Sequence, residues 1–150
     1  DCAIAPGGLP TPFEDGRPTG SALYFMVTPD APVHLHRIRN DQLYHRYLGD
    51  PLEVLLLLPD GSHRVEVMGD DLAAGQHLQL LLPGGTFHTA RLLAEAGGSR
   101  DGAGDGHDRW FLGASTEWPG VDPSDVEVGE ATELKRRFPA AADLLDDFLG

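Results

Sequence analysis

The hydrophobic positions of this 150-residue chain fall in short runs, most of which alternate with polar residues, and turn sequences separate the runs. Alternation with a period of two is typical of half-buried β-strands, because successive side chains of a strand point to opposite faces. Pro-Asp, Gly-Asp-Pro, Pro-Asp-Gly and Pro-Gly-Gly stand between the runs, where proline presets the backbone and glycine allows a positive φ. The pattern predicts eight strands, at residues 21–28, 33–38, 42–48, 52–58, 63–68, 77–82, 86–93 and 109–114. Short strands at this spacing are typical of a sandwich or barrel.

Two parts of the pattern indicate what covers the barrel. Residues 55–58 are continuously apolar, which predicts cover on both faces, by the barrel core and by a helix or a second subunit. The C-terminal stretch changes to a helical period of three and four residues. Because Pro139 fits only the first turn of a helix, we expect two short helices, at 130–138 and 139–149, packed outside the barrel.

The length is sufficient for one domain with a core that needs no disulfide, and Cys2 is the only cysteine. We expect a single domain over 1–150, with an N-terminal arm (1–20), a barrel (21–114) and a C-terminal turn with helices (115–150). Residues 94–107 are rich in glycine and lack apolar periodicity, which indicates a loop. That loop is either a lid over a pocket or a tolerated hairpin insertion.

The charge excludes two classes of partner. A net charge of -13 with scattered basic residues repels phosphate, so we expect no nucleic acid and no anionic membrane as partner. The longest apolar run, 54–58, is far shorter than a bilayer span, and no segment like a signal peptide opens the chain. We therefore expect a cytoplasmic protein with a small-molecule substrate.

Histidines are concentrated in two segments of the predicted barrel. His34 and His36 are two residues apart in one predicted strand, so alternation directs both to the same face, where two imidazoles can bind one ion. A second segment runs from Gly75 to the turn 83–85 and ends at His88. It offers a third histidine after a tight turn.

In order and spacing, these two segments resemble the motifs of the cupin superfamily. The first motif, His-x-His followed by Glu and then Gly, corresponds to His34, His36, Gln42 and Gly49, and the second ends at His88. The resemblance implies a mainly β fold, the cupin double-stranded β-helix or jelly-roll barrel, with one or two short C-terminal helices. It also implies a metal site formed by His34, His36, Gln42 and His88. The cofactor implied is a divalent transition metal (Zn, Ni, Mn or Fe), with a metal-free barrel as the alternative.

More narrowly, the chain resembles the small single-domain cupin-5 branch. That branch has an early Pro-x-Gly-Gly, a strand that ends in His-Arg, an Asp-Glu-x-x-His stretch and Gly-Asp-Pro-Leu. The corresponding residues here are 5–8, 36–37, 41–45 and 49–52. The resemblance reaches an aromatic-Pro-Gly turn at 118–120 and weakens over 9–20 and 94–107.

One position departs from the cupin pattern. Gln42 occupies the place of the usual glutamate, and a neutral amide binds a hard cation less well than a carboxylate does. Asp41 is adjacent, but alternation places it on the face opposite Gln42. A strand register shifted by one residue would exchange the two. The same alternation groups Asp41 with His45, and Gln42 with Tyr44.

Other residues near the motifs are candidates for chemistry and binding. Asp41, Tyr44 and His45 are candidates for moving a proton during catalysis. Arg37 and Arg46 offer bidentate donors to a substrate anion, although exposed salt bridges are the ordinary role of such residues. The aromatic candidates for substrate contact, which pack in cores more often than they bind ligands, are Tyr47, Phe87 and Trp110.

Three kinds of function fit these residues. The first is a metal-dependent isomerase, lyase or cyclase acting on a small polar metabolite, with an Fe(II) oxygenase as a variant. The second is a metal-free enzyme similar to sugar epimerases, with a histidine base and a tyrosine acid. The third is a small-molecule-binding cupin without turnover, and fold alone does not choose among the three. We also expect a homodimer, because the apolar strand at 55–58 needs cover.

Overall fold

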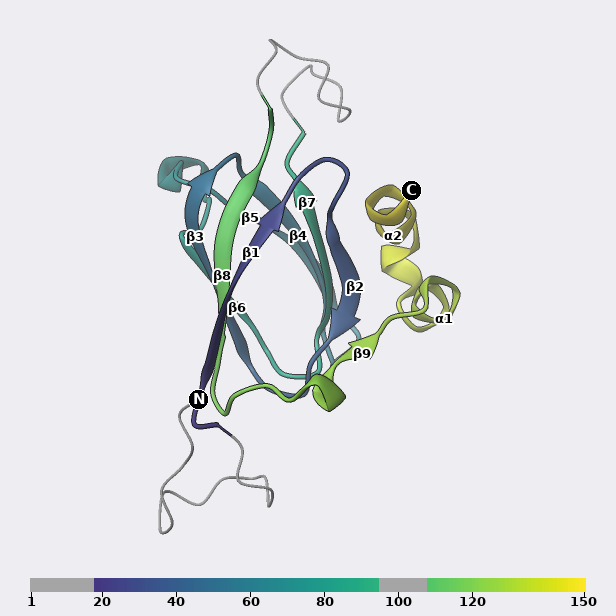
Figure 1. Cartoon of the computed structure of the whole chain (residues 1–150). Coiled ribbons are helices and arrows are strands. Elements are labelled where there is room, and N and C mark those ends of the chain that lie inside the picture. Colours follow the sequence, from purple (N-terminus) through teal and green to yellow (C-terminus); the bar gives the residue numbers. More distant parts are fainter. Residues whose placement is uncertain (1–17, 95–107) are drawn as a thin grey trace.

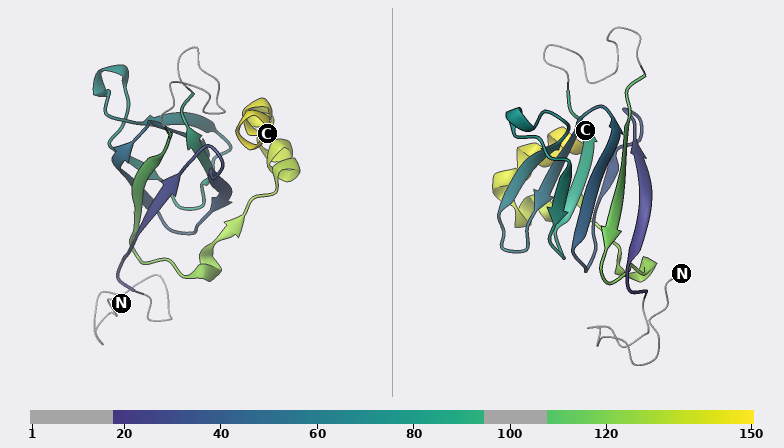
Figure 2. Two further views of the ribbon diagram at one scale, coloured as in Figure 1. Left: turned by 45° about the horizontal axis from the view of Figure 1, so that its top comes forward. Right: turned by 90° about the vertical axis from the view of Figure 1, so that its left-hand side faces the viewer.

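The computed structural model describes residues 18–94 and 108–150, which form two antiparallel β-sheets packed face to face (Figures 1 and 2). One sheet has the order β1-β8-β3-β6 and the other has the order β5-β4-β7-β2-β9. The strands are β1 (Ser21–Val27), β2 (Val33–Arg37), β3 (Gln42–Gly49), β4 (Leu52–Leu57), β5 (His63–Met68), β6 (Gln79–Leu82), β7 (Phe87–Leu92), β8 (Phe111–Glu117) and β9 (Glu127–Val128). Most successive strands lie in opposite sheets, as in a jelly-roll barrel. The predicted fold class is confirmed.

The helices follow the strands at the C-terminal side of the described chain. They are α1 (Ala131–Arg137) and α2 (Ala142–Leu149), joined by the 3-10 turn η3 (Pro139–Ala141). Two further 3-10 turns, η1 (Leu72–Ala74) and η2 (Pro123–Asp125), lie in loops. Pro139 begins η3, as its missing N–H and fixed φ favour. Neither helix in the described residues is long and apolar enough to span a membrane.

The continuously apolar strand β4 lies between two hydrophobic layers. Val54 and Leu56 pack inside the barrel, whereas Leu55 and Leu57 join a second cluster with residues of α1, η3 and α2. Figure 2 shows these helices outside the five-stranded sheet. The cover on the outer face is therefore a helical layer of the same chain. The homodimer stays a prediction, but β4 no longer requires it.

A polar contact adds to this layer at its outer edge. Arg91 of β7 lies 3.0 Å from the carboxylate of Glu53 in β4 and 2.6 Å from that of Asp147 in α2. Its guanidinium also stacks over the ring of Phe148, 3.8 Å from the ring centroid. One arginine thus links two strands of the sheet to α2.

All eight predicted strands are present, with ends that differ by a few residues. The clearest difference is β8, which continues past residue 114 to Glu117 and pairs there with β1 and β3. The short strand β9 was not predicted, because two residues are too few to show alternation. Residues 1–17 of the predicted arm and residues 95–107 of the predicted loop lie outside the described residues.

The helical layer predicts a contrast within α2. Leu145 is fully buried against the sheet, whereas Leu149 is 42% exposed. We expect Leu145→Ala to lower the free energy of unfolding by about 2–5 kcal/mol, because it leaves a cavity between helix and sheet. Leu149→Ala is the matched control, and urea unfolding measures both. Equal effects of the two variants would contradict the packing described here.

Candidate functional site

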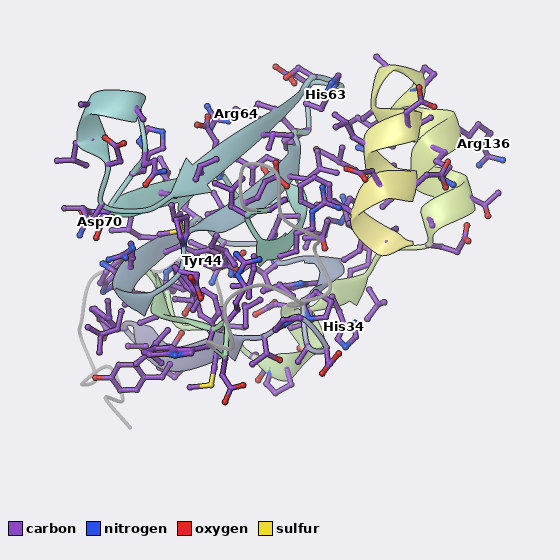
Figure 3. The ribbon with its side chains drawn as sticks, turned by 90° about the horizontal axis from the view of Figure 1, so that it is seen from above. His34, Tyr44, His63, Arg64, Asp70 and Arg136 are labelled. Carbon is purple, nitrogen blue, oxygen red and sulfur yellow. The ribbon has the colours of Figure 1, made fainter. Side chains whose placement is uncertain are left out.

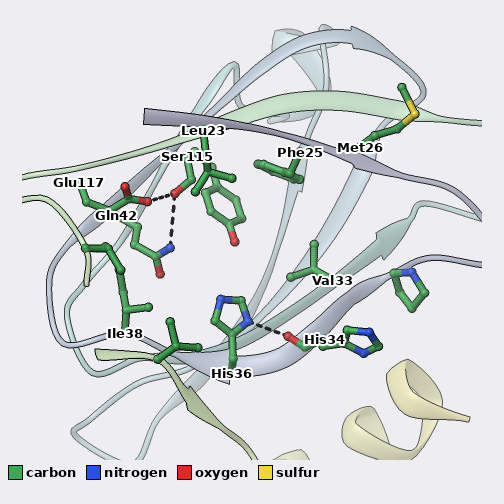
Figure 4. A pocket seen from close by; sticks show the side chains of 14 residues that line it. Leu23, Phe25, Met26, Val33, His34, His36, Ile38, Gln42, Ser115 and Glu117 are labelled. Atoms are coloured by element: carbon green, nitrogen blue, oxygen red, sulfur yellow. Dashed lines mark hydrogen bonds between the residues drawn. The ribbon is translucent and has the colours of Figure 1, made fainter. Parts of the chain in front are cut away.

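A cavity of about 330 Å³ lies between the two sheets, beside β1 and β2 (Figure 4). Its apolar wall consists of Leu23, Phe25, Met26, Pro32, Val33, Ile38, Val121 and Val126. Its polar lining consists of His34, His36, Gln42, Tyr44, Ser115 and Glu117. A small polar cluster in a mainly apolar cavity is the usual composition of a small-molecule site.

His36 faces this cavity because β2 contains one extra residue. Val33 pairs with Ala90 of β7, and His36 pairs with His88, so three steps along β2 match two along β7. Val33 packs against the barrel core, and Leu35 packs against the helical layer. The irregularity therefore directs Val33 and His36 to the same interior, although they are three residues apart.

The ring of His36 is oriented by a backbone hydrogen bond. Its Nδ1 lies 2.7 Å from the carbonyl oxygen of His34, and because a carbonyl only accepts, Nδ1 is the protonated nitrogen. In the neutral ring, Nε2 then has a free lone pair. Figure 4 shows that nitrogen directed into the cavity. His36 thus presents a base to a bound molecule.

His34 does not join His36 in the interior. Its side chain is exposed at the edge of the cavity, and in the view from above it lies well apart from Tyr44 (Figure 3). The expectation that both histidines share one face rested on simple alternation. The extra residue in β2 breaks that alternation.

His88 lies behind the cavity, fully buried. Its Nε2 is 2.8 Å from the hydroxyl of Tyr44, its Nδ1 is 3.3 Å from the carbonyl oxygen of Thr86, and its ring centroid is 4.3 Å from that of His36. Since the Thr86 carbonyl only accepts, Nδ1 is protonated and Nε2 accepts a hydrogen bond from the Tyr44 hydroxyl. Burial, followed by the proximity of His36, lowers the pKa of His88 to about 3. His88 is therefore neutral near pH 7.

Tyr44 stands between His88 and the cavity. Only 3% of its surface is exposed, and its ring packs against Phe25 at a centroid distance of 4.8 Å. Burial, together with the charge of Glu117, raises the pKa of the Tyr44 phenol above its usual value. The hydroxyl consequently stays protonated and is a hydrogen-bond donor at every physiological pH.

Glu117 is the charged residue of the described cavity lining that sequence reasoning missed. Its side chain is 1% exposed and lines the cavity at the end of β8. The hydroxyl of Ser21 donates to it at 2.6 Å, and the hydroxyl of Ser115 also donates to it. The alternation of Gly113, Ser115 and Glu117 on the inner face was available as a signal. It was lost because the predicted strand ended at residue 114.

The question of Asp41 or Gln42 is settled by their positions. Gln42 is buried and lines the cavity, and its amide nitrogen lies 3.4 Å from the Ser115 hydroxyl. Asp41 is exposed and accepts a hydrogen bond of 2.6 Å from the backbone N–H of Gly84. The grouping of Gln42 with Tyr44 on one face is confirmed. Asp41 instead holds the turn before β7, where Gly85 has a φ of 76°.

Three predicted residues of β3 lie away from the cavity. His45 is hydrogen bonded to the hydroxyl of Thr116 at 2.8 Å, and its ring stacks with that of Tyr47, which is 45% exposed. Arg46 donates to the carbonyl oxygen of Gly49 at 2.8 Å. The cavity therefore receives no side chain from these three positions.

The remaining substrate candidates also lie outside the cavity. Arg37 donates through Nε and Nη2 to the carboxylate of Glu127 at 2.9 and 2.7 Å, and its guanidinium stacks over the ring of Phe87. Phe87 belongs to the cluster under the helices. The backbone N–H of Trp110 donates to the Asp50 carboxylate at 2.9 Å, at the far end of β8. Each of these residues has a structural partner.

The side chains that could act as metal ligands do not form the metal centre that the motif implied. His36 Nε2 is available, but His88 Nε2 accepts the Tyr44 hydroxyl, His34 is exposed, and Gln42 offers only a neutral oxygen. Among the described residues, no group of three or more His, Cys, Asp or Glu side chains could hold a metal ion. The four predicted ligands are thus not gathered around one point.

The jelly-roll barrel and its interior pocket define a protein of the cupin class. The sequence model of the family Cupin_5, described as Cupin superfamily (DUF985), matches residues 5–129, and the chain belongs to this family. It is 26% identical over 109 residues to the uncharacterized protein YML079W of Saccharomyces cerevisiae. The aligned region covers 73% of this chain and 50% of the yeast protein. The chain thus spans about half the length of that yeast protein.

Solved structures with the same fold include proteins of several activities. A hypothetical protein from Leishmania major has a TM-score of 0.77 and 25% identity, over 92% of this chain and 81% of that chain. A dTDP sugar isomerase from Desulfovibrio desulfuricans has a TM-score of 0.58 and 16% identity, over 91% and 83%. Oxalate decarboxylase from Bacillus subtilis has a TM-score of 0.55 and 9% identity, over 88% and 31%. The last two similarities show the fold alone.

The buried His88 predicts a specific pH dependence of stability. The unfolded chain binds a proton near pH 6.5, which the folded chain does not bind until about pH 3. The free energy of unfolding therefore falls as pH decreases through this interval. We expect His88→Gln, which has no such group, to lose less stability between neutral pH and about pH 4.5, as measured by urea unfolding. His63→Gln, in β5, is the control, and parallel curves for wild type and His88→Gln would contradict the prediction.

Proposed function

We propose that this protein is an enzyme of the isomerase type, which moves a proton on a small molecule bound in the cavity and needs no metal for this step. The observation that carries the proposal is the buried hydrogen bond of 2.8 Å between Tyr44 and His88, next to His36. It places a protonated phenol and an unprotonated imidazole nitrogen at one end of an apolar cavity. Such a pair is suited to general acid and general base chemistry.

His36 is the proposed base. Its Nδ1 proton is held by the His34 carbonyl, so the lone pair of Nε2 is directed to the ligand. From a carbon next to a carbonyl group, Nε2 would take the proton, and the electrons of that C–H bond would form an enolate. Return of the same proton to a different carbon or to the other face completes an isomerisation. No other reactant is required.

Tyr44 is the proposed donor to the enolate oxygen. Because burial and Glu117 raise the pKa of the phenol, it does not release its proton to solvent but donates a hydrogen bond when negative charge develops. His88 acts through Tyr44, since it does not line the cavity. Its neutral Nε2 holds the phenol in position until the hydroxyl turns to the substrate. His88 is thus a positioning residue.

Two further observations support this class of reaction over metal chemistry. Among the described residues, the side chains at the cavity do not form a set of ligands for a transition metal. Gln42 also occupies the position where metal-binding cupins have a carboxylate. The fold is also shared with a dTDP sugar isomerase, although that similarity concerns the fold alone. The corresponding substrate here is a small carbonyl compound with an acidic C–H bond.

Exchange of carbon-bound hydrogen tests the proposal on any substrate of this class. The purified protein is incubated in D₂O with pools of small carbonyl metabolites, and mass spectrometry detects incorporated deuterium. We expect Tyr44→Phe to reduce the exchange rate about 100-fold or more, because the developing oxyanion loses its donor. Tyr47→Phe removes an equivalent hydroxyl from the outer face and serves as the matched control.

Metal dependence is tested on the same exchange reaction. We expect unchanged exchange after incubation with EDTA, together with less than about one equivalent of transition metal per chain by elemental analysis. Exchange that EDTA abolishes and an added metal restores would reject the metal-free step. Equal activity of Tyr44→Phe and Tyr47→Phe would reject the assigned role of Tyr44.

A further inference from the structure

The polar end of the cavity contains a buried carboxylate, Glu117, to which the described residues supply no lysine or arginine as countercharge. Glu117 is 1% exposed, and its partners are the hydroxyls of Ser21 and Ser115. Within residues 18–94 and 108–150, no lysine or arginine lines the cavity, and none pairs with this carboxylate. Burying a carboxylate is costly unless charge and hydrogen bonds compensate it, and here only hydroxyl donors do so.

The donors at this end are already engaged with one another. The Ser21 and Ser115 hydroxyls donate to Glu117, the Gln42 amide nitrogen is directed to Ser115, and the Tyr44 hydroxyl is bound to His88. The polar groups left facing the cavity are mainly acceptors: the carboxylate of Glu117, the amide oxygen of Gln42 and Nε2 of His36 (Figure 4). The donors that remain are the second N–H of the Gln42 amide and the Tyr44 hydroxyl, if it turns from His88. This balance favours a molecule that brings hydrogen-bond donors of its own.

We propose that the cavity binds a compact, largely apolar molecule that carries a protonated amine and no anionic group. An ammonium group has three N–H donors and one positive charge, which match the acceptors and the uncompensated charge of Glu117. The apolar wall from Leu23, Phe25 and Ile38 receives the remainder of the molecule. The charge preference is argued from the cavity alone, and it rests on the proposed function only in specifying that the carbonyl substrate proposed there also carries an amine.

The same electrostatics argue against phosphate and carboxylate ligands. A diphosphate or a carboxylate would face Glu117 in a cavity whose described lining has no cationic lysine or arginine. The overall charge of -13 adds to the repulsion. A nucleotide sugar such as the dTDP sugar of the isomerase with the same fold therefore does not match this cavity.

Three probes with the same aromatic body and different polar ends test the inference: 2-phenylethylamine, 2-phenylethanol and phenylacetate. Isothermal titration calorimetry near neutral pH measures their affinities for wild type, Glu117→Gln and Glu133→Gln. We expect wild type to bind the amine about tenfold or more tightly than the alcohol, and phenylacetate more weakly than both. Glu117→Gln should lose the preference for the amine. Glu133→Gln, which removes an exposed carboxylate on α1, should keep it.

The wild-type comparison alone can overturn the inference, so it does not depend on the stability of Glu117→Gln. Phenylacetate binding as tightly as the amine, or no binding of the amine at millimolar concentration, would overturn it. Retention of the amine preference in a folded Glu117→Gln would also do so. None of these outcomes bears on the exchange assay with Tyr44→Phe. Conversely, an exchange assay that contradicts the proton-transfer proposal would not change the charge preference measured by calorimetry.

Discussion

The hydrogen bond between Tyr44 of β3 and His88 of β7 joins the two sheets inside the barrel, and the chemistry of the interior depends on it. A buried phenol and a buried imidazole would each be costly alone, because both would leave polar atoms without partners. Together they satisfy each other, and the surrounding burial keeps the imidazole neutral and the phenol protonated. The protonation states that define the site are thus consequences of packing. Solvent contact at His88 would remove them.

The sequence was sufficient for the fold and for part of the site. Alternation placed Gln42 and Tyr44 on one face of β3, and this is confirmed, because β3 and β6 pair there without interruption. Alternation failed at His34, because an extra residue in β2 cannot be recognised from residue types alone. Glu117 was missed since Ser115, Thr116 and Glu117 resemble the start of a polar loop, and only their pairing with β1 and β3 makes them strand. Local patterns specify faces, whereas irregular register and strand ends depend on the partner strand.

The chain contains the spacing of the cupin motif, but its described residues do not form the metal site that the motif usually forms. The spacing of His34, His36, Gln42 and His88 agrees with the cupin superfamily, and the chain belongs to one of its families. In this barrel these positions do not form a metal centre. His34 is exposed, His88 is hydrogen bonded behind the cavity, and Gln42 offers an amide in place of a carboxylate. The carboxylate of Glu117 lies on β8, where it adds negative charge to the cavity without forming a metal-binding group with the histidines. The shared scaffold therefore supports a different arrangement of donors and acceptors.

The two sides of the cavity differ in how many neighbours hold them. Tyr44 and His88 belong to β3 and β7, each of which is paired on both edges, and β7 is additionally covered by the helical layer. Leu23, Phe25 and Met26 belong to β1, which lies at the edge of its sheet and, among the described strands, pairs only with β8. Local opening requires least free energy where few contacts are lost, so we expect backbone amide hydrogens of β1 to exchange with solvent sooner than those of β7. We therefore expect the side of the cavity formed by Tyr44 to be more rigid than the apolar side formed by β1. A site built in this way would fix the part of a ligand that meets Tyr44 and tolerate variation in the hydrocarbon body that meets β1.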